Sequence, residues 1–111
     1  MARVGLIGIG LVGSVIAERL LDAKYQVAGY DIRQEQCETL ARLGGEPLAD
    51  ARAVAECCER VILSLPASDT VRRVIYEINA ALRPGCLVLD TTTGAPEDAE
   101  EVAHVGLVLE A

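Results

Sequence analysis

Residues 3–13 read RVGLIGIGLVG, an apolar stretch that becomes rich in glycine at Gly8, Gly10 and Gly13. Residues 3–9 form a short apolar run that ends in glycines, which is typical of a buried β-strand. From Leu11 onward the apolar residues recur at helical spacing, at positions 12, 15, 16, 20 and 23. The stretch therefore predicts a strand, a glycine turn and a helix in immediate succession.

The same alternation of strand and helix continues along the chain. Further strands are predicted at 26–30, 46–49, 61–65, 86–89 and 106–109, and further helices at 34–43, 50–58, 68–82 and 96–104. Asp50 and Ser68 are candidate N-caps, and Gly44-Gly45 is a helix stop signal. Alternating strands and helices predict an α/β fold: a Rossmann-type, doubly wound parallel sheet of about six strands in three layers.

The length and composition fit one globular domain covering residues 1–111. The net charge of −7 disfavours nucleic acid and anionic membranes as partners, because binding to phosphate depends on Lys and Arg. The four cysteines form neither a CxxC pair nor a Cys/His cluster. This pattern predicts no metal site and favours a reduced, cytoplasmic setting.

A GxGxxG motif joins the first strand to the first helix and consists of Gly8, Ile9, Gly10, Leu11, Val12 and Gly13. Gly8 allows a tight turn, Gly10 lets a pyrophosphate approach the backbone, and Gly13 lets the helix pack close to the sheet. The free N–H groups and the positive dipole end of the helix stabilise the pyrophosphate charge. The motif predicts a dinucleotide site at this turn; the alternative is a glycine turn that binds nothing.

Asp31 closes the second strand, 18 residues beyond Gly13. At this place a carboxylate can accept both hydroxyls of an adenosine ribose, and a 2′-phosphate would meet a negative charge. Asp31 and its neighbour Ile32 are therefore predicted cofactor contacts, and NAD is favoured over NADP. Arg33 can receive a 2′-phosphate and keeps NADP as the less favoured alternative. Asp31 could also be a solvated acid in a turn.

Residues 90–96 read DTTTGAP and follow the fifth predicted strand directly. Their adjacent hydroxyls could bind a carboxylate, a carbonyl oxygen or the nicotinamide amide. They could equally cap the helix that begins near Pro96. The residues alone leave both interpretations open.

Together these motifs resemble the β-hydroxyacid dehydrogenase family, which includes 3-hydroxyisobutyrate dehydrogenase, tartronate semialdehyde reductase and, more distantly, 6-phosphogluconate dehydrogenase. Residues 5–13 match the family pattern G-[LF]-I-G-[LI]-G-x-M-G, with Val12 in place of the usual Met. Leu65-Pro66 matches the Leu-Pro that ends the family's fourth strand, and Thr70 lies five residues after that Leu. The resemblance implies that Leu65, Pro66 and Thr70 contact the cofactor.

The family's substrate signature, D-x-S-T-x-x-P, is matched by Asp90, Thr93 and Pro96, with Thr92 in the Ser place. The resemblance implies that Thr92 binds the substrate and that Thr93 contacts both the nicotinamide end of the cofactor and the substrate. Thr92 keeps the hydroxyl but adds a methyl group, which bears on substrate size.

Members of the resembled family are more than twice as long as this chain. They continue into a helical domain that supplies a catalytic Lys and much of a dimer interface. The resemblance therefore implies that the expected Lys lies beyond Ala111 and that no catalytic residue lies in this chain. Lys24 is predicted to lie away from the carboxyl ends of the strands, where a doubly wound sheet binds its ligands. His104 is interpreted as a surface residue near a helix C-terminus, and Ser64 and the cysteines as packing residues.

The resemblance implies the cofactor domain of an NAD-dependent, homo-oligomeric dehydrogenase or reductase. The full enzyme would transfer a hydride between nicotinamide and a small carboxylated β-hydroxy acid or its semialdehyde. Two alternatives remain: a nucleotide-sensing regulatory module with a Rossmann fold, and another Rossmann reductase of the imine- or proline-forming type. The regulatory module would need the glycine motif and Asp31, but not Leu65-Pro66 or the threonines.

Overall fold

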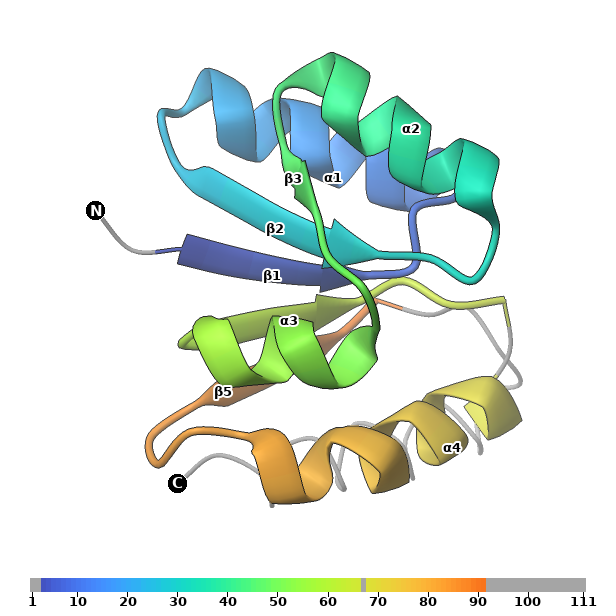
Figure 1. The fold of residues 1–111 in the computed structure, drawn as a ribbon, viewed down its shortest axis with the longest axis vertical. Helices are drawn as coiled ribbons and strands as arrows, with labels where there is room; N and C mark the ends of the chain where they lie inside the picture. The colour runs from blue at the N-terminus through green and yellow to red at the C-terminus, as the bar shows by residue number, and fades with distance from the viewer. Residues whose placement is uncertain (1–2, 67, 92–111) are drawn as a thin grey trace.

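A computed structural model describes residues 3–66 and 68–91 of the chain (Figure 1). The elements are β1 (Arg3–Ile7), α1 (Leu11–Asp22), β2 (Gln26–Tyr30), α2 (Gln34–Leu43), β3 (Glu46–Pro47), α3 (Ala51–Cys57), β4 (Arg60–Leu63), α4 (Ser68–Ile78), the 3₁₀-helix η1 (Asn79–Ala81) and β5 (Leu87–Asp90). The helix predicted at 96–104 and the strand predicted at 106–109 lie outside the described residues.

The described strands form one five-stranded sheet in the order β3-β2-β1-β4-β5. All neighbouring pairs are parallel, and Val4 of β1 lies between Val27 of β2 and Arg60 of β4. Along the chain, β2 and then β3 are added on one side of β1, after which the chain crosses back and adds β4 and then β5 on the other side. The order therefore reverses beside β1, which is where doubly wound sheets bind their ligands.

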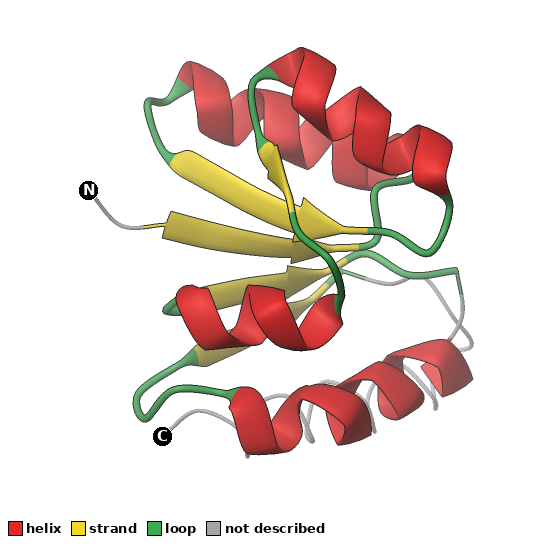
Figure 2. Ribbon diagram, in the orientation of Figure 1, coloured by secondary structure: helices red, strands yellow, loops and turns green. Residues whose placement is uncertain are grey.

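Helices cover both faces of the sheet, so the predicted three layers are confirmed (Figure 2). On one face, α1 and α2 pack over a core of Leu6, Ile9, Ala17, Val27 and Leu40. On the other, α3 and α4 pack over a larger core that includes Val54, Val61, Leu63, Val71, Ile75 and Ile78. Aliphatic side chains and buried cysteines thus fill the interior, as expected of a parallel sheet buried on both faces.

Several predicted boundaries are wrong by one to four residues, and local geometry explains two of them. The first strand stops at Ile7 because Gly8, at φ 97°, turns the backbone out of the extended region. The last strand begins at Leu87, since the N–H of Cys86 still closes a turn onto Arg83. The fourth strand covers 60–63 instead of 61–65, the third ends at residue 47 instead of 49, and the helix predicted to residue 82 ends at Ile78 and continues as η1.

Two predicted helix ends are confirmed. Gly44 follows α2 in the left-handed region at φ 107°, and its N–H donates to the carbonyl of Ala41. Asp50 caps α3 by accepting a hydrogen bond from the N–H of Ala53 at 2.8 Å. None of the helices in the described residues is both long and apolar enough to cross a membrane.

Candidate cofactor site

The carboxyl ends of β1, β2 and β4 converge on one pocket. The N–H of Gly8 donates to the carbonyl of Tyr30, and the N–H of Ser64 donates to that of Ile7, both at 2.9 Å. These bonds continue the sheet ladder beyond the last strand residues and hold the three loops together. The pocket has a volume of about 620 Å³, within the range of ligand sites.

The three motif glycines have different surroundings. A Cβ on Gly8 would overlap the carbonyl oxygen of Ser64, and a Cβ on Gly13 would overlap the carbonyl oxygen of Gly8. Beside Gly10, Nη2 of Arg33 at 3.6 Å is the only atom within 4 Å of such a Cβ among the described residues, apart from the two chain neighbours of Gly10. Gly8 and Gly13 are therefore required by backbone packing, whereas Gly10 leaves open space that a ligand can occupy.

The N-terminus of α1 faces this open space without a side-chain cap. Its N-cap is Gly10, which offers no cap hydrogen bond, and its first turn contains no acidic residue. The first N–H groups of a helix have no intrahelical partners, and the helix dipole places positive potential there. An anion such as a pyrophosphate would therefore be stabilised at this position.

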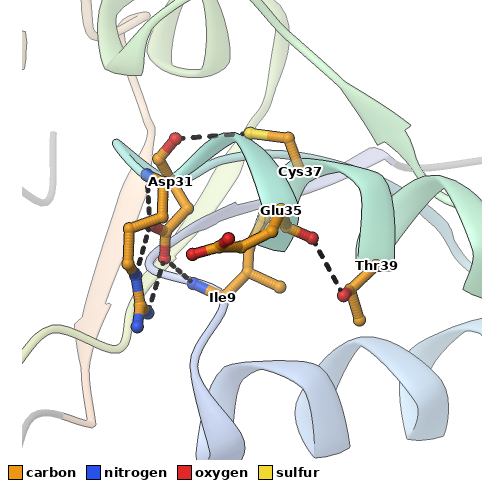
Figure 3. A network of polar contacts seen from close by, with 6 residues as sticks. Ile9, Asp31, Glu35, Cys37 and Thr39 are labelled. Carbon is orange, nitrogen blue, oxygen red and sulfur yellow. Dashed lines mark hydrogen bonds and ion pairs between the residues drawn. The ribbon is translucent and has the colours of Figure 1, made fainter.

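Asp31 lies directly after β2 and is almost completely buried. Its Oδ2 accepts from the N–H of Ile9 at 2.8 Å, and its Oδ1 accepts from the N–H of Arg33 at 2.8 Å. The Arg33 side chain adds contacts from Nε to Oδ1 at 3.2 Å and from Nη2 to Oδ2 at 3.3 Å. Figure 3 shows the carboxylate bonded to the glycine turn at Ile9, with Cys37 donating to the Asp31 carbonyl.

The carboxylate of Asp31 is stabilised in its charged form. Burial alone would raise the pKa of this carboxyl, but the hydrogen bonds from the Arg33 side chain and from the N–H groups of Ile9 and Arg33 outweigh it. The net effect is a pKa below the ordinary value of 3.8. Asp31 is therefore ionised at neutral pH and is no solvated turn acid.

One face of α4 forms the opposite wall of the pocket. Besides the predicted Thr70, it contributes Arg73, Val74 and Glu77, which the sequence analysis did not select. Their spacing of three and four residues places all four on one helical face, adjoining the buried face of Val71, Ile75 and Ile78. The sequence signal for these pocket residues was their helical spacing. A helix that follows Leu65-Pro66 begins beside the carboxyl ends of the strands, so one of its faces must adjoin the pocket.

Most of the predicted site residues line the pocket. Those that do are Gly8, Gly10, Leu11, Val12, Asp31, Ile32, Leu65, Pro66 and Thr70. Ile9 and Gly13 are not among the lining residues: Ile9 is buried and holds Asp31 through its N–H, and Gly13 packs against the turn. Ser64, interpreted as a packing residue, does line the pocket.

The threonine run is only partly described. The Thr91 hydroxyl donates to the carbonyl of Leu63 at 2.9 Å, and the Thr91 N–H donates to the same oxygen at 2.8 Å. Thr91 therefore joins the end of β5 to β4 and has its hydroxyl proton already engaged. Thr92 and Thr93, the predicted substrate contacts, lie outside the described residues, as does His104.

The remaining reactive side chains lie away from the pocket. All four cysteines are free thiols, and none of them is a lining residue. Burial, with the neighbouring Cys57, raises the pKa of the Cys58 thiol to about 12, so Cys58 is a protonated core residue. Lys24 follows α1 and precedes β2, so it lies at the amino ends of the strands, whereas the pocket lies at their carboxyl ends. Within residues 3–66 and 68–91, no group of three or more potential ligands could hold a metal ion.

Residues 3–106 match the family described as the NAD binding domain of 6-phosphogluconate dehydrogenase. The chain belongs to this family. This NAD-binding domain is 31% identical to L-threonate dehydrogenase of Cupriavidus necator over 114 residues, which covers 96% of the chain and 38% of that relative. The resemblance to β-hydroxyacid dehydrogenases and the predicted Rossmann-like α/β fold are thereby confirmed.

Solved structures agree with this assignment. The structure of Mycobacterium tuberculosis 3-hydroxyisobutyrate dehydrogenase with L-serine matches the NAD-binding domain with a TM-score of 0.91 and 27% identity, over 99% of this chain and 38% of that chain. The imine reductase of Streptomyces aurantiacus matches with a TM-score of 0.84 and 26% identity, over 98% of this chain and 38% of that chain. The 111 residues thus span under two fifths of the length of these proteins.

Proposed function

We propose that the domain binds NAD(H), in preference to NADP(H), along the pocket at the ends of β1, β2 and β4. The observation that carries this proposal is the meeting, in one pocket, of an uncapped helix N-terminus, the open space beside Gly10 and the ionised Asp31. The pyrophosphate lies on the N-terminus of α1, and the adenosine ribose lies at Asp31. Leu65, Pro66 and Thr70 flank the cofactor from the β4 side.

The full protein, in this proposal, is an oxidoreductase that acts on a small β-hydroxy acid or its semialdehyde. When bound, the cofactor would accept a hydride at nicotinamide C4 from the hydroxy acid, or donate one from there to the semialdehyde. Thr92 binds the substrate and Thr93 lies beside the nicotinamide end, while the proton donor, a Lys, comes from residues beyond Ala111. The four free thiols support a cytoplasmic setting, and the acidic composition supports the absence of nucleic-acid and membrane partners. The homo-oligomer in this proposal rests on the resemblance to β-hydroxyacid dehydrogenases.

A second candidate function is the reduction of imines. The match to the Streptomyces aurantiacus imine reductase favours it, since that match also covers nearly the whole chain. Both functions would use the same cofactor-binding domain, and they differ in the substrate that the full protein binds. Turnover of hydroxy acids and of cyclic imines by the full protein therefore separates them.

The cofactor site is tested by calorimetric titration of NADH into wild-type protein and into two glycine variants. Gly10→Ala places a methyl group in open space, so we expect unchanged thermal stability but at least a tenfold loss of NADH affinity. Gly44→Ala is the matched control, far from the lining residues: its φ of 107° makes alanine strained, so stability falls and NADH affinity is retained. NADH affinity that is unchanged in Gly10→Ala would contradict a pyrophosphate at this turn.

A further inference from the structure

The acceptor capacity of Asp31 is fully used within the protein. An ionised carboxylate offers about four lone-pair positions. Two of these accept from the backbone N–H groups of Ile9 and Arg33, and two accept from the Arg33 guanidinium. The carboxylate that should receive the two ribose hydroxyls therefore has no free acceptor position.

The four donors differ in how easily they can be exchanged. The Ile9 and Arg33 N–H groups belong to the glycine turn and the N-cap of α2, and their bonds of 2.8 Å hold those segments in place. The guanidinium contacts are longer, at 3.2 and 3.3 Å, and they come from a side chain that is 52% exposed. Only the guanidinium can leave without disturbing the backbone.

The guanidinium also occupies space that a cofactor needs. Its Nη2 lies 3.6 Å from where a Cβ of Gly10 would be, with no other described residue beyond the two chain neighbours as close, and Arg33 is itself a lining residue of the pocket. The side chain thus reaches from the start of α2 past Asp31 to the glycine turn. A ribose that reaches Asp31 has to take the place of this side chain.

We infer that Arg33 is a displaceable side chain that occupies the ribose acceptor positions of Asp31 in the free protein and reduces its selectivity for NAD(H) over NADP(H). This inference rests on the proposed NAD(H) site. For NAD(H), breaking the Asp31–Arg33 pair is a cost of binding. For NADP(H), the released guanidinium becomes a cationic partner for the 2′-phosphate, which offsets the repulsion by Asp31.

If Arg33 is displaced in this way, removing its positive charge should strengthen the binding of NADH and weaken the binding of NADPH. In Arg33→Ala the ribose meets free acceptor positions, so the dissociation constant for NADH should fall about two- to fivefold, as expected for one partly exposed ion pair. The constant for NADPH should rise about tenfold or more, because a charge-assisted hydrogen bond to phosphate is lost. Arg33→Lys should keep NADPH affinity and gain little for NADH.

The test is calorimetric titration of NADH and of NADPH into the wild type and the variants. Arg42→Ala is the charge-matched control, because Arg42 is an exposed residue in the last turn of the same helix, α2, outside the pocket. Its affinities should stay at wild-type values. Thermal unfolding of each variant confirms that it is folded, and Arg33→Gln replaces Arg33→Ala if the latter is not.

These titrations distinguish a failure of the Arg33 displacement from a failure of the proposed NAD(H) site. A wild-type protein that binds neither cofactor refutes the proposed function itself. Wild-type binding of NADH with unchanged or weaker NADH binding in Arg33→Ala overturns only the displacement of Arg33. Tighter NADH binding together with weaker NADPH binding supports it, and equal losses for both would make Arg33 a direct contact to the part that the cofactors share.

Discussion

At the scale of single residues, Asp31 has a structural role besides the one predicted from its place in the sequence. The end of the second strand identified it as a ribose contact, and it does line the pocket. Its bond to the N–H of Ile9 could not be predicted, because it depends on the three-dimensional approach of the glycine turn to β2. The same carboxylate thus orders the turn that leads into the proposed pyrophosphate site at the N-terminus of α1.

Asp31→Asn should lower the free energy of unfolding by about 1–3 kcal/mol at pH 7, because the amide places donors against the donors of Arg33. The pKa of Asp31 is lowered in the folded state, so its stabilisation is complete above pH 3.8 and is lost as the pH falls through the lower folded value. The difference from wild type should be constant between about pH 7 and 5 and shrink below about pH 4. Urea unfolding across this range measures it.

Asp22→Asn is the control for this comparison, since Asp22 is an exposed carboxyl at the end of α1. It should leave stability close to wild type at every pH. A stability gap for Asp31→Asn that persists unchanged below pH 3 would show that the carboxylate charge is not what stabilises the turn.

At the scale of elements, local signals placed β2 and α2 with the observed bounds, because each is bracketed by clear stop residues. Tyr30 is followed by the hydrogen-bonded Asp31, and α2 ends at the left-handed Gly44. The ends of β3 and β4 were less predictable. They depend on where a neighbouring strand offers backbone partners, which a local sequence pattern does not show. Within the part of the chain that the structure describes, β3 pairs only with Ala28 and Gly29 of β2.

The short helix α3 should depend strongly on its cap. Asp50 is its N-cap, and seven residues are too few for a helix to be stable without capping and packing. Asp50→Ala should destabilise the protein by about 1 kcal/mol, whereas Asp50→Asn or Asp50→Ser should cost little. Chemical denaturation of the three variants measures this; equal losses in all three would point to charge instead of capping.

At the scale of the whole molecule, alternation and handedness predicted a doubly wound parallel sheet, whereas the strand order β3-β2-β1-β4-β5 is a finding of the structure. The glycine motif after the first strand predicted the ligand site at the end of β1. The wall formed by Arg73, Val74 and Glu77 was not predicted, because it depends on how α4 is rotated against the sheet. That rotation is set by the burial of Val71, Ile75 and Ile78, a tertiary property that periodicity describes only in part.

We expect the 111-residue chain to bind NADH without oxidising it. Among the described residues that line the pocket there is no Lys or His to protonate a developing alkoxide. Absorbance of NADH in the presence of a semialdehyde should therefore stay constant, with the full protein as the positive control. A steady decrease that is abolished in Gly10→Ala would show that the chain contains its own acid.

The outer strand β3 restricts how copies of this domain can associate. It has only two residues: Pro47 has no N–H to donate, and Glu46 is exposed and carries a charge. A strand from a second copy would find almost no backbone hydrogen-bonding partners along β3, so edge-to-edge aggregation through β3 is disfavoured. At high protein concentration, the β3 edge therefore stays exposed to water instead of pairing with a second copy of the domain.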